Sequence, residues 1–175
     1  SPLAALNPQR KNIADFIKES VAVVTNPAID RDRETEHFST RTIIGQRPSL
    51  YEKQQPGAVI ELQTPILIEG KAGFECSTAL GQPSYDQVTG FYQEQKLISY
   101  LSTTFRKDET IKEALDRLAA EAVEAVQSGK TLLVLDDANA HQEDAYWIDP
   151  HLAVSAIDQA LVKEALRREC SILLR

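Results

Sequence analysis

The chain has 175 residues, 42% of them hydrophobic, which fits a single domain with a sizeable core. With 19 lysines and arginines against 26 aspartates and glutamates, the formal net charge of -7 argues against binding to nucleic acid or anionic lipid. No apolar run approaches the roughly 20 residues that span a bilayer, and no secretory signal is recognisable, so we expect no membrane partner and a cytoplasmic location.

The N-terminal part predicts an amphipathic helix that ends at a proline. Asn7 and Pro8 are typical of a helix start. Apolar residues then recur at helical spacing, at Ile13, Phe16, Ile17, Val21 and Val24. Pro27 disfavours helical geometry at the residue before it, so the helix should end near Thr25 and the chain should turn there.

The middle of the chain has weaker patterns. Residues 38–44 alternate between apolar and polar positions and are predicted to be a strand, and residues 58–62 suggest another strand. From Gly70 to Gly90 the sequence contains glycines, prolines and polar residues with little periodicity. We therefore predict a long, flexible connection over residues 70–95.

The C-terminal part alternates between strand and helix patterns. The predicted elements are a strand at 96–105, a helix at 110–129, a strand at 131–135, a polar loop at 136–149, a helix at 150–168 and a strand at 171–174. This order predicts an α/β fold with a mostly parallel sheet and crossover helices, as in a doubly wound sheet or part of a (β/α) barrel. Because a parallel strand is normally followed by more structure, we expect the chain to be a segment of a longer protein.

Two adjacent acids follow the strand predicted at 131–135. Ligands gather at the carboxyl ends of parallel strands, so Asp136 and Asp137 are candidates for a metal or catalytic site. Their spacing differs from that of haloacid-dehalogenase-type phosphatases, because Ala138 stands where that motif has its second aspartate. Two interpretations stay open: a metal-dependent hydrolase or phosphatase, and a solvated rim whose acids cap loop amides.

The remaining candidates have no partner at a telling spacing. Cys76 and Cys170 lie far apart without the spacing of a zinc or redox site, which is typical of buried thiols in a reducing compartment. Tyr146 and Trp147 either stack a ligand in a small-molecule pocket or pack against the helix that follows them. Composition and spacing alone predict an α/β domain without a convincing active site.

Several motifs resemble the central domain of the large subunit of glutamate synthase. They are "PLAAL" at 2–6, "VTNPAID" at 24–30 followed by Arg33-Glu34, and "LAVSAI" at 152–157. The family's second motif reads Val-Thr-Asn-Pro-Pro-Ile-Asp, so only Ala28 departs from it. "LSTTF" at 101–105 and "GKTLLVLDD" at 129–137 follow in the family's order. Residues 45–95 match poorly, and residues 136–138 stand where the family has Ser-Asp-Arg.

The resemblance implies a non-catalytic, linking role inside an oxidoreductase. In glutamate synthases a glutaminase domain releases ammonia, and an FMN-binding domain uses it to convert 2-oxoglutarate to glutamate. The central domain of that family is similar to a rudimentary flavin-type (β/α) barrel. The resemblance therefore implies that residues 1–175 bind no cofactor and show no turnover alone. FMN and an iron–sulfur cluster belong to the parent enzyme, and the glutaminase and FMN-binding domains of the same polypeptide are the partners.

The resemblance also implies a role for the turn at Thr25-Asn26-Pro27. The family places this turn near the entrance of a tunnel through which ammonia passes between the two active sites. A helix end presents free carbonyl acceptors, and ammonia donates hydrogen bonds. The positions that match are Thr25 and Asn26 at the tunnel, with Pro27, Arg33 and Glu34 at an interdomain contact. Read without the resemblance, the same turn only ends a helix.

Overall fold

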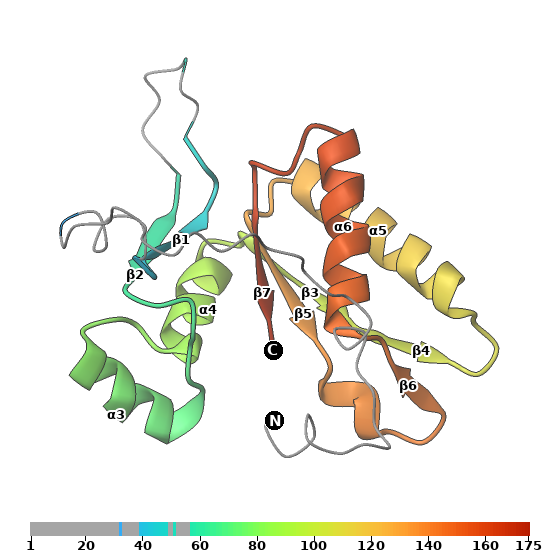
Figure 1. The fold of residues 1–175 in the computed structure, drawn as a ribbon, viewed down its shortest axis with the longest axis horizontal. Coiled ribbons are helices and arrows are strands. Elements are labelled where there is room, and N and C mark those ends of the chain that lie inside the picture. Colours follow the sequence, from blue (N-terminus) through green and yellow to red (C-terminus); the bar gives the residue numbers. More distant parts are fainter. Residues whose placement is uncertain (1–31, 33–38, 49–50, 52–56) are drawn as a thin grey trace, which may run out of the picture. The chain divides into compact units, whose positions relative to one another are not determined.

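The computed structural model describes residues 39–48 and 57–175, together with Asp32 and Tyr51 (Figure 1). Contacts divide the chain into two units, Ser1–Ser39 and Thr40–Arg175, and all the elements given below belong to the second unit. The helix predicted from Pro8 to Val24 and the turn at residues 25–27 lie outside the described residues.

A parallel sheet of three strands lies at the centre of this unit. Its strands are β3 (Ile98–Ser102), β5 (Leu132–Asp136) and β7 (Ser171–Leu174), in the order β3-β5-β7. Helix α5 (Ile111–Gln127) follows β3 in the chain, and helix α6 (Pro150–Lys163) follows β5. The predicted α/β fold with a parallel sheet and helices is therefore confirmed, while the resemblance to a flavin-type barrel stays a prediction.

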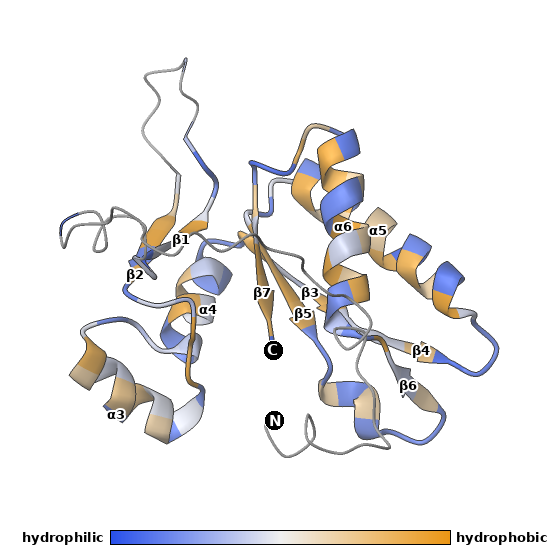
Figure 2. Cartoon of the chain, viewed as in Figure 1, coloured by the Kyte–Doolittle hydropathy of each residue, from blue (hydrophilic) through white to orange (hydrophobic). Residues whose placement is uncertain are grey.

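Both faces of the sheet are covered, which explains the unbroken apolar run of β5. Leu133 and Leu135 pack with α5 and α6 in one hydrophobic cluster. Leu132 and Val134 point the other way and pack in a second cluster with residues of α4, β1 and β2. Figure 2 shows the hydrophobic strands and the alternation of hydrophobic and hydrophilic residues along α5 and α6. None of the described helices is long and apolar enough to cross a membrane.

The starts of α5 and α6 follow from local sequence signals. Thr110 caps α5 and forms a reciprocal capping box with Glu113. Asp149 caps α6, whose first residue is Pro150, as the sequence predicts. Helix α6 ends at Lys163, earlier than the predicted residue 168. The reason is that Ala165 has a positive φ of 58°, which is incompatible with a continuing right-handed helix.

The segment predicted as a long connection folds instead into two helices, α3 (Gly70–Leu80) and α4 (Tyr85–Glu94). Helix α3 escapes a search for apolar periodicity because its buried positions are the small residues Gly73 and Ser77. Helix α4 begins at a capping box formed by Ser84 and Gln87. Unlike α3, helix α4 buries Tyr85, Val88 and Tyr92 at helical spacing, so the prediction of a connection overlooked a pattern that the sequence contains.

The other elements adjust the predicted boundaries. Strands β1 (Thr42–Gly45) and β2 (Val59–Leu62) form an antiparallel pair where the sequence predicts two strands. The single strand predicted at 96–105 is divided at Thr103 into β3 and β4 (Thr104–Arg106). Strand β4 pairs with β6 (Ala145–Trp147), which lies in the predicted polar loop after the 3-10 helix η2 (Ala138–His141).

Tyr92 joins α4 to the β1–β2 pair. Its fully buried hydroxyl lies 2.9 Å from the carbonyl oxygens of both Ile44 and Ala58 and donates to them. Burial raises the pKa of Tyr92 from 10.0 to about 12. The neutral phenol is therefore the form that the fold requires.

This raised pKa predicts a loss of stability at alkaline pH. Tyr92 ionises near pH 10 in the unfolded chain and near pH 12 in the folded chain. The stabilisation that its buried neutral form provides is therefore complete below pH 10 and is lost as the pH rises through this interval. We expect Tyr92 to lower the free energy of unfolding by up to about 1.4 kcal/mol per pH unit there. Urea denaturation from pH 9 upward should show a shallower decline for Tyr92→Phe. Parallel curves for the two proteins would contradict the prediction.

Candidate functional site

The carboxyl edge of the parallel sheet holds the two acids that the sequence singles out. Asp136 is the last residue of β5 and is partly buried, whereas Asp137 is exposed. One carboxylate oxygen of Asp136 accepts a hydrogen bond from the Ala138 amide at 3.0 Å, and the other lies 3.2 Å from Nη1 of Arg175. Both oxygens of Asp136 thus have partners within the fold.

These contacts favour the loop-capping interpretation of Asp136. Across the part of the chain that the structure describes, no three His, Cys, Asp or Glu side chains are grouped so that they could hold a metal ion. Nothing in this geometry favours a metal-dependent hydrolase or phosphatase built on Asp136 and Asp137.

Arg175 gathers an ionic cluster at this edge that the sequence does not reveal. Its guanidinium donates to both carboxylate oxygens of Glu69, at 2.6 and 3.4 Å, besides its contact with Asp136. It also lies over the ring of Tyr85, 5.6 Å from the centroid. The hydrogen bonds to Glu69 hold the pKa of Arg175 above its ordinary value. The cluster fixes the residue that precedes α3 to the carboxyl ends of β5 and β7.

Tyr85 lies beneath this cluster in the first turn of α4. Its side chain is buried, and its hydroxyl has no hydrogen-bond partner among the residues that the structure describes. Burial raises the pKa of Tyr85 to about 12, with a smaller contribution from Tyr100. Tyr85 therefore stays neutral and acts as an apolar support for the guanidinium of Arg175.

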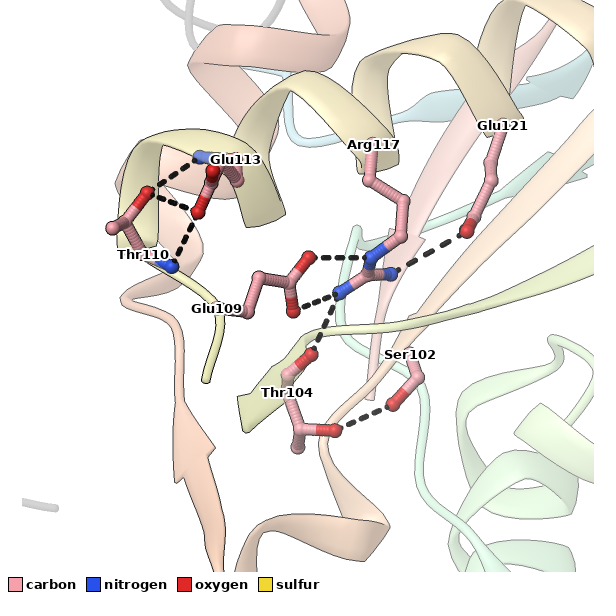
Figure 3. A network of polar contacts seen from close by, with 7 residues as sticks. All are labelled: Ser102, Thr104, Glu109, Thr110, Glu113, Arg117 and Glu121. Carbon is pink, nitrogen blue, oxygen red and sulfur yellow. Dashed lines mark hydrogen bonds and ion pairs between the residues drawn. The ribbon is translucent and has the colours of Figure 1, made fainter. Parts of the chain in front are cut away.

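A second polar network connects β4 to α5 (Figure 3). Arg117 of α5 donates to both carboxylate oxygens of Glu109, at 2.9 and 3.2 Å, to the Thr104 carbonyl at 3.0 Å and to Glu121 at 3.4 Å. The bidentate contact with Glu109 is the main reason that the pKa of Arg117 is raised. Arg117 thus fixes the loop between β4 and α5 at its two ends.

An open polar pocket of about 690 Å³ lies beside this network. It is lined by residues of β4, the loop at 107–109, Arg117 and the segment from η2 to the start of β6. Its walls carry both positive and negative side chains, and Lys107 forms an ion pair with Asp144. The described residues that line the pocket include no nucleophile with an adjacent base.

The aromatic pair is not among the residues that line this pocket, although Tyr146 contacts one of them. Tyr146 and Trp147 are neighbours in β6, and each is 43% exposed. The Tyr146 ring packs against Phe105 of β4, with ring centroids 5.4 Å apart. Tyr146 therefore packs against strand β4, rather than against the following helix α6 as one interpretation of the sequence has it. The predicted tunnel and contact residues, Thr25, Asn26, Pro27, Arg33 and Glu34, lie outside the described residues.

Sequence comparisons identify the relatives of the chain. A family model described as "Glutamate synthase central domain" matches residues 1–175, so the match includes the segment 45–95. Ferredoxin-dependent glutamate synthase 1 of Arabidopsis thaliana is 34% identical over 175 residues, covering 98% of this chain. The large chain of the NADPH glutamate synthase of Bacillus subtilis is 30% identical over 175 residues, covering 99%.

The ferredoxin-dependent glutamate synthase of Pyropia yezoensis is 29% identical over 178 residues, again covering 99% of this chain. In each of these three comparisons the matched part is only 10% of the relative's own length. This chain therefore corresponds to about a tenth of such a protein, and the resemblance that its motifs indicate is confirmed: the chain belongs to the family of glutamate synthase central domains.

Proposed function

We propose that this chain is the central domain of a glutamate synthase large subunit, where it links the glutaminase domain to the FMN-binding domain. The observation that carries the proposal is the match of the family over all 175 residues, in relatives about ten times as long. The activity of the whole enzyme, glutamate synthesis from glutamine and 2-oxoglutarate, would then need the rest of the polypeptide. We expect the 175-residue chain alone to show no turnover, and we expect a cytoplasmic location.

The cysteine content supports placing an iron–sulfur cluster elsewhere in the polypeptide. Such clusters are held by several cysteine thiolates, typically four, and this chain has two cysteines in all. Cys170 is buried, and burial raises the pKa of its thiol to about 11, which disfavours the thiolate that a metal requires. Cys76, by contrast, is exposed.

The N-termini of the two helices α5 and α6 also support the placement of FMN elsewhere. A flavin phosphate binds well at free helix N-termini. Here the side chain of Glu113 accepts a hydrogen bond from the Thr110 amide at the start of α5, and the side chain of Asp149 accepts one from the His151 amide at the start of α6. Carboxylates in these places would repel a phosphate. FMN, which supplies the redox chemistry of the reaction, would be held by its own domain.

We further propose that Thr25 and Asn26 form part of the wall of the ammonia tunnel. Carbonyl oxygens at the end of the predicted helix can accept hydrogen bonds from ammonia, and Pro27 cannot donate an N–H that would occupy them. Pro27, Arg33 and Glu34 would contact the neighbouring domains. Support for these roles comes from the motif "VTNPAID" and from the family match that covers it.

The test uses the full-length large subunit with tryptophan in place of Thr25 or Asn26. A bulky side chain in the tunnel should block ammonia without affecting either active site. We expect glutaminase activity and synthesis from added ammonia to persist, while glutamine-dependent glutamate synthesis falls at least about tenfold, equivalent to about 1.4 kcal/mol. Reduced ferredoxin and NADPH are both supplied as electron donors.

Val162→Trp is the matched control, because Val162 is 59% exposed on α6 and tolerates added bulk. This control should leave glutaminase activity, synthesis from added ammonia and glutamine-dependent synthesis at the levels of the unmodified enzyme. If the tryptophans at positions 25 and 26 leave synthesis fully coupled in a folded enzyme, the turn only ends a helix and the tunnel role is wrong.

A further inference from the structure

The outer edge of β7 faces no other strand that the structure describes. β7 is the last strand in the order β3-β5-β7. The Ser171 amide donates to the carbonyl of Thr131, the residue before β5, and the Arg175 amide donates to the carbonyl of Leu135 in β5, at 2.9 Å each. Peptide groups of successive strand residues point to opposite sides, so those of Ile172 and Leu174 point away from β5. Within the described part of the chain, no strand pairs with this side of β7.

The residues of β7 itself lack the features that normally prevent unwanted strand pairing. Natural edge strands are protected by charged residues, proline or bulges. β7 reads Ser-Ile-Leu-Leu, and the charge that follows it, on Arg175, is held by Glu69 and Asp136. An unprotected apolar edge of this kind is typical of a strand that is paired in the complete protein.

An apolar groove of about 360 Å³ accompanies the edge on the α6 side. It is lined by Leu174 and by the first half of α6, including Pro150 and Val154. Leu174 is 51% exposed. A strand paired with β7 would direct every second side chain to this face of the sheet, where an apolar side chain would cover Leu174 and Val154.

We propose that an extended segment with alternating apolar residues, from the part of the longer glutamate synthase chain outside residues 1–175, pairs with β7 and fills this groove. The inference rests on the proposed function, since it needs the remaining nine tenths of the polypeptide. The unit Ser1–Ser39 is a poorer source, because the pattern of residues 8–24 predicts a helix rather than an extended segment. Backbone pairing gives the affinity, and the groove selects the side chains.

Residue-resolved hydrogen exchange of the full-length large subunit tests the pairing. We expect the amides of Ile172 and Leu174 to be protected to the same degree as those of Ser171 and Leu173. Leu174→Lys should speed exchange at 172 and 174 at least about tenfold, because a charge in the groove opens the pairing locally. Leu80→Lys is the matched control, since Leu80 is also 51% exposed, and it should leave these amides unchanged.

Alternating protection, with only Ser171 and Leu173 slow to exchange, would overturn the proposal. A photoreactive benzoylphenylalanine in place of Leu174 then identifies the occupant by cross-linking. This measurement also serves if Leu174→Lys disturbs the whole strand. A cross-link to a segment of the same polypeptide outside residues 1–175 supports the proposal. A cross-link to residues 1–38 or to a second copy, or none, overturns it. Neither readout needs enzymatic activity, so a failure of the tunnel experiment remains distinguishable.

Discussion

Replacing Leu118 with alanine should lower the free energy of unfolding by about 3 kcal/mol, within the range of roughly 2–5 kcal/mol for buried leucines. Leu118 is fully buried in α5, in the cluster that joins α5 and α6 to Leu133 and Leu135 of β5. Truncation removes apolar contacts and leaves a cavity, because the two helices and the sheet around it cannot move together far enough to fill it. A domain of this size is stabilised by only about 5–15 kcal/mol, so the loss would be a large share of the total.

Chemical denaturation of the 175-residue chain, followed by circular dichroism, measures this effect. Leu80→Ala is the matched control, because Leu80 is half-exposed at the end of α3 and its truncation should change the free energy of unfolding by less than about 0.5 kcal/mol. Equal losses in the two variants would show that the α5–α6 cluster is not the main core of the chain.

Replacing Gly45 with alanine should destabilise the chain by about 3 kcal/mol or more. Gly45 ends β1 with a φ of 117°, a conformation that side chains strongly disfavour. A Cβ atom built there would lie 2.3 Å from the Ala58 carbonyl oxygen and 2.7 Å from the Tyr92 hydroxyl. The added methyl group would therefore disrupt the hydrogen bonds of Tyr92 that join α4 to the β1–β2 pair, in addition to straining the backbone.

Two other glycines separate these causes in the same denaturation experiment. Gly129 has a positive φ of 91°, but a Cβ atom added to it would meet no described atom within 4 Å, so Gly129→Ala measures backbone strain alone, about 1 kcal/mol. Gly90 lies inside α4 with open space around it, so Gly90→Ala should stabilise the chain by about 0.5–1 kcal/mol. If Gly45→Ala costs no more than Gly129→Ala, the close approach to Ala58 is not a constraint.

Two arginines connect acidic side chains from different elements of the fold. Arg175 holds Glu69 and Asp136 together, and Arg117 holds Glu109 against β4. These side chains are engaged with one another, which supports a structural role for them.

The sequence alone determined the strand–helix alternation of residues 96–174 and the family. Strand β5 and helix α5 are visible in sequence because their side chains are buried in long, regular patterns, and the caps at Thr110 and Asp149 are local. The family motifs are likewise short stretches of neighbouring residues. Local signals of this kind do not depend on what the chain folds against.

Tertiary structure alone decided the features that join distant residues. Helix α3 buries small residues, so nothing in its own sequence distinguishes it from a loop until it packs. Glu69 and Arg175 are 106 positions apart, and only the placement of α3 beside the sheet brings their charges together. The same holds for Tyr92, whose hydroxyl meets carbonyls of β1 and of the residue before β2. Pairings across such separations depend on the packing of whole elements, which no local pattern of residues encodes.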